Sequence, residues 1–229
     1  MIYCSENGHT LKITDEKSFN GFYEKSHTIN FESIKELFIT GCIINDFTFL
    51  LNMTALEKLV FLACKSYNWS ELIGNKSIKI LRLHNIKQGK EYLSNIDFLC
   101  TFPNLEYLYV NMLGIETFPN VSMMKKLHTI CSSNRKLNDY STMEFAPSLK
   151  VFIGWMAVDK HRTSAEAFIP ILKNRTLEAF EYTQMFSVED KKLDSYVKIY
   201  APNIIYPIST VQDAIVDISE QQKIVNIFF

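Results

Sequence analysis

The sequence predicts an α/β solenoid in which short parallel strands alternate with returns of loop or short helix. One observation is a segment with apolar residues at its first, fourth and sixth positions, a spacing typical of a short strand followed by a turn. The segment recurs seven times, and its starts are separated by 22, 22, 27, 22, 22 and 28 residues. A second observation is that 19 of the 21 sites so defined are apolar, where the overall content of 47% would place about ten. Seven matches in one register predict an array in which each unit buries its apolar face against its neighbours.

The repeat is defined by three inward positions. The first positions are Ile34, Leu56, Ile78, Leu105, Leu127, Leu149 and Leu177. The fourth positions are Leu37, Leu59, Leu81, Leu108, Ile130, Phe152 and Phe180. The sixth positions are Ile39, Phe61, Leu83, Val110, Ser132, Gly154 and Tyr182. An eighth start at Ile204 is interrupted by Pro207.

Three of these segments carry a family resemblance. Leu56–Cys64, Ile78–Leu83 and Leu105–Leu113 resemble the leucine-rich-repeat pattern L-x-x-L-x-L-x-x-N/C-x-L, and the resemblance covers about residues 30–186. It implies a horseshoe-shaped solenoid with a parallel β-sheet on the concave face and short helices or loops on the convex face. It also implies a non-enzymatic module, without a cofactor, that recognises a protein through the concave face.

The ninth position departs from the family pattern. No segment carries Asn there, so the ladder that this side chain often builds is not expected. Ser132 and Gly154 at sixth positions, together with Arg135 at a ninth, predict local distortion in repeats five and six. Cys42 and Cys64 share the ninth position on adjacent strands, about 5 Å apart. A disulfide between them is geometrically conceivable, but we expect two reduced, buried thiols.

The chain is expected to form one structural domain that begins with an N-terminal cap over residues 1–33. Strands are predicted at Ile2–Cys4 and Thr10–Ile13, around a turn at Asn7–Gly8. Aromatic residues at helical spacing predict a short helix over residues 18–25. Repeat arrays need such end caps to cover their terminal units.

The seven units occupy residues 34–186, and two of them are long enough to hold a helix in the return. In the third unit, residues 90–99 have helical periodicity. In the sixth, Thr163–Glu166 resembles a capping box and predicts a helix that begins there.

Residues 187–229 are predicted to form a degenerate last repeat and a C-terminal cap. Strands are expected at Tyr196–Tyr200 and Asn203–Ile208. A helix is expected over Thr210–Val225, with its apolar residues near one face.

The net charge, the pI and the absence of known enzyme motifs argue against several functions. The net charge of -1 and the pI near 6.5 argue against nucleic acid or an anionic membrane as partner. The sequence lacks a P-loop, a dinucleotide-binding glycine motif, a nucleophile elbow and an H-E-x-x-H motif. His84 and His128 have no ligand cluster at metal spacing. Without a recognisable signal peptide or a membrane-spanning apolar run, we expect a cytoplasmic, monomeric protein without enzymatic activity or metal.

The third, fifth and seventh positions of the strands form columns on the predicted concave face. These positions should face solvent, yet many are apolar or aromatic, which is costly unless something covers them. Tyr, Trp and Arg are also enriched at binding hot spots. The predicted partner-binding residues are Phe38, Val60, Leu62, Arg82, His84, Tyr107, Tyr109, Asn111, Ile153, Trp155 and Glu181. Arg82 and His84 could also bind a carboxylate or a phosphorylated side chain.

Two alternatives to partner binding stay open. Flanking loops or a terminal segment could cover the columns, or a slip of one residue could exchange the two faces. For the function itself, the specific candidates are a bacterial cytosolic immunity or antitoxin protein and a regulatory adaptor. The alternative class is a surface or secreted adhesin-like repeat protein seen without its export signal.

Overall fold

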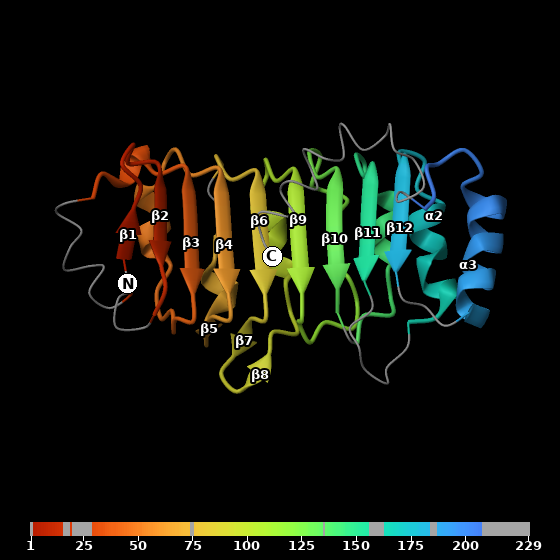
Figure 1. Ribbon diagram of the computed structural model, residues 1–229, viewed down its shortest axis with the longest axis horizontal. Coiled ribbons are helices and arrows are strands. Elements are labelled where there is room, and N and C mark those ends of the chain that lie inside the picture. The colour runs from red at the N-terminus through yellow and green to blue at the C-terminus, as the bar shows by residue number, and fades with distance from the viewer. Residues whose placement is uncertain are drawn as a thin grey trace.

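Nine strands form a single sheet in the computed structural model, which describes residues 2–15, 19, 29–73, 76–134, 136–155, 163–183 and 187–207. The strands lie side by side in chain order along the long axis, and the returns lie behind them (Figure 1). The strands are β1 (Ile2–Cys4), β2 (Thr10–Ile13), β3 (Glu36–Thr40), β4 (Lys58–Leu62), β6 (Ile80–His84), β9 (Tyr107–Asn111), β10 (Thr129–Ser133), β11 (Val151–Trp155) and β12 (Ala179–Thr183).

The parallel register is the one that the repeat pattern predicts. Strands β3 to β12 pair so that equal repeat positions face each other, and every first, fourth and sixth position is buried. The fourth positions form one continuous row: Leu37, Leu59, Leu81, Leu108, Ile130, Phe152 and Phe180. The predicted register is therefore confirmed, and a slip of one residue is excluded.

The parallel sheet begins earlier than the seven predicted units. Strand β2 pairs in parallel with β3, and its Leu11 and Ile13 are fully buried opposite Leu37 and Ile39. Strand β1 pairs antiparallel with β2, as the two predicted strands of the cap require. The helix predicted over residues 18–25 lies outside the described residues, apart from the buried Phe19.

The exits of four consecutive strands share a left-handed turn at the eighth repeat position. The backbone φ angles are 67° at Gly41, 51° at Ala63, 54° at Asn85 and 54° at Met112. Each of these N–H groups donates to the carbonyl at the seventh position of the next strand. The left-handed conformation costs a non-glycine residue about 1–2 kcal/mol. At each of these turns the same residue also forms a hydrogen bond to the next repeat.

The third return contains a hairpin where a helix was predicted over residues 90–99, so that prediction is wrong. Strands β7 (Lys87–Gln88) and β8 (Glu91–Tyr92) pair antiparallel around Gly89, and β5 (Lys65–Ser66) joins β7 in parallel. A 3-10 helix at Asp97–Thr101 follows. The five extra residues of this unit form a projecting turn, visible below β6 in Figure 1. Glycine fits it because Gly89 has a φ of 62°.

The remaining returns are short and mostly 3-10 helical. The 3-10 helices are Phe31–Ser33, Thr48–Asn52, Trp69–Glu71, Ser141–Phe145 and Ala165–Phe168, the last continuing into α2 (Ile169–Leu172). The predicted capping box at Thr163–Glu166 does not form: the N-cap is Ser164, without a side-chain cap bond. The Ala165 N–H instead donates to Glu189 Oε2 at 2.8 Å.

The end of the array is covered by a helix, α3 (Ser187–Tyr200), so the predicted strand at Tyr196–Tyr200 is wrong. Leu193, Val197 and Ala201 are spaced four apart and are buried, which is the pattern of one helix stripe packed on a core. The predicted strand at Asn203–Ile208 is reduced to a single bridge between Ile205 and Ala179. The helix predicted over Thr210–Val225 lies outside the described residues.

The expected distortion at Gly154 is absent, because a neighbouring aromatic ring fills the place of its missing side chain. A Cβ atom on Gly154 would lie 2.6 Å from Cε2 of Tyr182 and closer still to Cδ2. The Tyr182 ring in turn packs against Phe168, with ring centroids 4.4 Å apart. A small residue and a large residue at the same repeat position thus complement each other in adjacent strands.

Asn134 carries out a ladder function that the ninth position lacks, although Asn134 occupies the eighth. Its buried side chain accepts from the Leu113 N–H at 2.8 Å and donates to the Val110 carbonyl at 3.1 Å and to Ser132 Oγ at 3.0 Å. This single bridge is not the ladder of ninth-position asparagines, which the sequence did not predict. Ser132, the other irregular sixth position, is buried with a hydrogen-bond partner.

The two ninth-position cysteines are free thiols and are buried, as predicted. Cys64 Sγ donates to the Ile39 carbonyl at 3.2 Å, and Cys42 Sγ donates to the Thr40 carbonyl at 3.3 Å. Burial raises the pKa of Cys42 to about 12 and that of Cys64 to about 11. Both thiols therefore remain protonated at neutral pH.

Candidate protein-binding face

The candidate site lies on the outer sheet face, formed by the third, fifth and seventh repeat positions of β3 to β12. Because successive side chains of a strand point to opposite sides, these positions point away from the core formed by the first, fourth and sixth. Strand β2 extends the face, since its Lys12 pairs with Phe38.

The predicted site residues are not equally accessible. Val60 is 0% exposed and Arg82 is 4% exposed, so neither is the solvent-facing side chain that we expected. The half-buried members of the set are Phe38, Leu62, His84, Tyr107, Tyr109, Asn111, Ile153 and Glu181. Trp155 ends β11, and its side chain lies outside what the structure describes.

Strands β6 and β9 bring four predicted residues together into what we call the central patch: Arg82, His84, Tyr109 and Asn111. Their strand pairing places Arg82 beside Tyr109 and His84 beside Asn111. The guanidinium carbon of Arg82 lies 4.3 Å from the Tyr109 ring centroid, and the His84 ring centroid lies 6.5 Å from the same ring. Asn111 Nδ2 donates to the Tyr109 hydroxyl at 2.9 Å. The patch therefore combines a cation over an aromatic face with amide and imidazole groups.

The charge state of the central patch follows from its burial. Burial lowers the pKa of His84, and the nearby positive charge of Arg82 lowers it further, so His84 is neutral at neutral pH. Burial also lowers the pKa of Arg82, but arginine starts so high that its guanidinium stays charged. The patch thus presents one fixed positive charge beside a neutral imidazole.

Three polar atoms at the exit end of this patch are buried. His84 Nδ1, Asn85 Oδ1 and Asn111 Oδ1 have no hydrogen-bond partner among the residues that the structure describes. Leaving such a group unsatisfied costs about 1–3 kcal/mol. A bound molecule whose groups form hydrogen bonds with these atoms would therefore bind more tightly and in a defined orientation.

Sequence reasoning missed the basic flank of the face. Phe38 lies beneath two ammonium groups, with Lys58 Nζ 5.1 Å and Lys12 Nζ 5.3 Å from its ring centroid. Glu36 Oε1 is 3.7 Å from Lys58 Nζ. Lys12 was missed because it belongs to the strand β2 that the pattern assigned to the cap, although its alternation with Leu11 and Ile13 was a usable signal.

The far end of the face is a separate apolar patch. Val151 and Ala179 form a small buried cluster with Ile153 and Ile205 packed against it. Ile153 and Glu181 therefore lie on β11 and β12, apart from the central patch on β6 and β9, with β10 between them. The predicted site divides into two parts.

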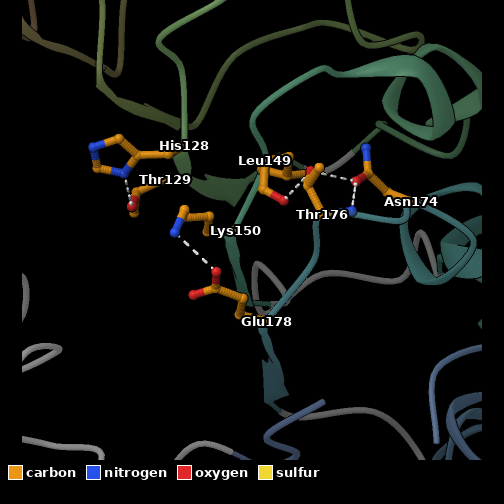
Figure 2. A network of polar contacts seen from close by, with 7 residues as sticks. All are labelled: His128, Thr129, Leu149, Lys150, Asn174, Thr176 and Glu178. Carbon is orange, nitrogen blue, oxygen red and sulfur yellow. Dashed lines mark hydrogen bonds and ion pairs between the residues drawn. The ribbon is translucent and has the colours of Figure 1, made fainter. Parts of the chain in front are cut away.

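The strands that carry the face are tied together at their entry ends. Figure 2 shows Thr176 Oγ1 donating to the Leu149 carbonyl at 2.8 Å and Lys150 Nζ paired with Glu178 Oε1 at 2.8 Å. The Asn174 side chain accepts from Thr176 and is buried. The residue before the first repeat position makes similar bonds to the preceding unit at Ser33, Ser77, Asn104 and Ser148. These bonds support a rigid face.

A groove on the return side offers less chemistry. Its lining includes Asp97, Glu116 and Lys136, all exposed, with Glu116 Oε1 3.9 Å from Lys136 Nζ. Exposed charges lack the desolvation that tunes catalytic groups. In the described part of the chain, no three His, Cys, Asp or Glu residues are grouped to hold a metal ion. Nor is any described helix long and apolar enough to cross a membrane.

Comparison with known proteins finds similarity only among solved structures. No protein-family model matches the chain, and no curated protein matches its sequence. The internalin inlF from Listeria monocytogenes is 16% identical, with a TM-score of 0.43 over 67% of this chain and 50% of that one. The internalin C2 from the same organism is 18% identical, with a TM-score of 0.48 over 76% of this chain and 80% of that one. The chain thus spans about half the length of inlF.

The assignment of the fold rests on the repeats themselves. Seven units carry inward residues at the first, fourth and sixth positions, and their strands pair in parallel with equal positions opposite each other. The units are joined by short returns that are mostly 3-10 helical. A repeat of this length and pattern, stacked in this register, gives the chain the fold of a leucine-rich-repeat solenoid.

Proposed function

We propose that this protein is a non-enzymatic binding module that recognises a protein partner through the outer sheet face. The observation that carries the proposal is the central patch, where Arg82 and Tyr109 stack beside buried polar atoms of His84 and Asn111. Arg and Tyr are enriched at hot spots, which lie in partly desolvated surroundings of this kind. A partner that supplies hydrogen-bonding groups there would satisfy atoms that the described residues leave unsatisfied.

The charges on the N-terminal half of the face favour an acidic partner surface. Lys12, Lys58 and Arg82 belong to the third and fifth positions of β2, β4 and β6, against a single acid, Glu36. Burial lowers the pKa of Lys58, and Glu36 opposes that shift. Complementary charge of this kind contributes mainly to specificity and to the rate of association.

The specific roles suggested by the sequence are an immunity or antitoxin protein and a regulatory adaptor, both cytoplasmic. Either role needs only a rigid, self-contained recognition face. Identifying the bound partner separates them, because an immunity protein would bind and inhibit a toxin, whereas an adaptor would leave its partner active.

The test is affinity capture with matched variants. Tyr107→Ala/Tyr109→Ala removes two half-buried rings of the face, and Leu51→Ala/Phe145→Ala removes two side chains, 67% and 70% exposed, on the return side. A loss of about 2 kcal/mol or more is typical of a hot spot and weakens Kd about 30-fold. We expect a partner identified by mass spectrometry to be retained by wild type and by the return-side variant, and lost by the face variant. Retention of that partner by a folded face variant would remove the site from this face.

A further inference from the structure

We propose that the small sheet β5–β7–β8, at the exit ends of β4 and β6, is a second binding surface and that it takes an acidic peptide segment of a protein. The inference goes beyond the proposed function, because this sheet is separate from the outer sheet face and projects below it in Figure 1. We call its basic and aromatic residues the hairpin surface: Lys65, Tyr67, Lys87, Lys90 and Tyr92.

The strand register places the basic residues of this sheet together. Lys65 of β5 pairs with Lys87 of β7, and Lys87 pairs in turn with Tyr92 of β8. Paired residues of neighbouring strands point to the same face, and the strands are about 4.8 Å apart, so the three side chains form one row. Glu91, the acid of β8, pairs with Gln88 and therefore points to the opposite face. The two charge types are thus separated.

The ammonium groups of the hairpin surface lack carboxylate partners. Among the residues that the structure describes, none of Lys65, Lys87 and Lys90 forms an ion pair. Like charges at directly paired positions destabilise a sheet, and Lys65 beside Lys87 is such a pair. A carboxylate that contacts both ammonium groups would offset this repulsion.

Two exposed tyrosine rings lie beside these charges. Tyr67, which follows β5, is 70% exposed, and its ring covers the glycine of the turn: a Cβ atom on Gly89 would lie 3.1 Å from its Cε1. Tyr92 is 37% exposed, and Lys87 Nζ lies 5.3 Å from its ring centroid. A tyrosine ring has two side-chain torsions, so its ordering on binding costs little entropy. The rings therefore add contact area to the charge.

The hairpin is held in place by bonds to the preceding unit. The buried Trp69 donates from Nε1 to the Lys87 carbonyl at 2.9 Å, and Gln88 Nε2 donates to the Tyr67 carbonyl at 3.2 Å. On the other side, the Tyr92 backbone lies against the next unit, since a Cβ atom on Gly114 would lie 3.0 Å from the Tyr92 carbonyl oxygen. The surface is thus preorganised, which lowers the cost of binding.

Acids around the hairpin surface favour a short acidic peptide over a long polyanion. The groove that begins two residues after β8 is lined by the exposed Asp97 and Glu116. A row across three strands is about 10 Å wide, and alternate side chains of an extended peptide are about 7 Å apart. Two acidic side chains of one peptide therefore fit the row. A nucleic acid depends on many phosphate contacts, and beyond the row it would meet carboxylates.

The test is an NMR titration of the full chain with an octaglutamate peptide. We expect saturable shifts of backbone amides that concentrate at residues 65–67 and 87–92. Lys65→Gln/Lys87→Gln/Lys90→Gln should weaken Kd about tenfold, because three exposed ion pairs are lost. The matched control, Lys125→Gln/Lys126→Gln/Lys191→Gln, removes the same charge from exposed positions elsewhere and should change Kd less than about twofold.

Four outcomes would overturn the proposal: no saturable binding, shifts confined to the outer sheet face, equal loss in the two lysine variants, or equal or tighter binding of an oligothymidylate with the same number of charges. The last outcome would assign the surface to nucleic acid. The titration contains no partner protein, whereas the affinity capture tests the outer sheet face. Failure of this proposal is therefore distinguishable from failure of the proposed function.

Discussion

Gly154→Ala is the substitution whose consequence the structure defines most sharply. The new methyl group would lie 2.6 Å from Cε2 of Tyr182, closer still to Cδ2, and 3.2 Å from Cε1 of Phe152. Carbon atoms pack best at about 3.5–4.0 Å, so the Tyr182 ring must move by more than about 1 Å. It has little freedom to do so, because Phe168 lies against it at 4.4 Å between centroids. Overpacking of this kind costs about 1–3 kcal/mol, and we expect the upper half of that range.

The assay is urea unfolding followed by circular dichroism, completed as a double-mutant cycle. Tyr182→Leu removes the ring that fills the site, and the same Gly154→Ala change should then cost less than about 0.5 kcal/mol. Residues in contact commonly show coupling of about 0.5–3 kcal/mol. In a thermal melt, the single variant should lose roughly 4–12 °C in Tm. Equal costs of Gly154→Ala with and without the Tyr182 ring would refute the reasoning.

Two further predictions concern buried polar and thiol groups. Asn134→Ala leaves the buried N–H of Leu113 without the partner that Asn134 provides and should lower the free energy of unfolding by about 1–3 kcal/mol in urea titrations. Asn95→Ala, at an exposed turn, should cost under about 1 kcal/mol, and similar losses for both variants would contradict this account. The thiols of Cys42 and Cys64 have pKa values raised to about 12 and about 11, whereas unfolded thiols ionise near 8.5. The contribution of the two protonated thiols to the free energy of unfolding is therefore complete below about pH 8.5 and is lost as pH rises toward 11 and 12. Over this range, the free energy of unfolding should fall less steeply with pH in Cys42→Ala/Cys64→Ala than in wild type.

The repeat pattern predicted the sheet well because burial imposes its own periodicity. A strand residue that faces the core must be apolar in every unit, and an error of one residue would place it in solvent. The fourth-position row from Leu37 to Phe180 therefore follows directly from the sequence. The predicted site residues were placed on one face by the same alternation, and the proximity of Arg82 and His84 to Tyr109 followed from their positions.

The returns and the ends were predicted less well because several backbones satisfy the same apolar spacing. Tyr92 and Leu93 suggested a helix, yet the segment forms a hairpin around Gly89. At the C-terminal end, Tyr196–Tyr200 was assigned to a strand, although Leu193 and Val197 are buried on one side of α3 and the buried Ala201 directly follows it. In such short segments, the choice between helix and strand depends on the neighbouring apolar surface against which the segment packs.

The sequence by itself determined the register of the seven predicted units and the residues on each of their faces, because these depend on a periodicity of two that every unit repeats. Only the tertiary structure decided how particular side chains complement each other across units. The Tyr182 ring fills the space at Gly154, and Asn134 turns inward from the eighth position to bond Leu113 and Val110. Glu189 accepts from the first N–H of the helix at Ala165–Phe168, where the predicted capping box does not form. These contacts join residues more than 20 positions apart, and their distances and angles depend on the stacking of one unit on the next.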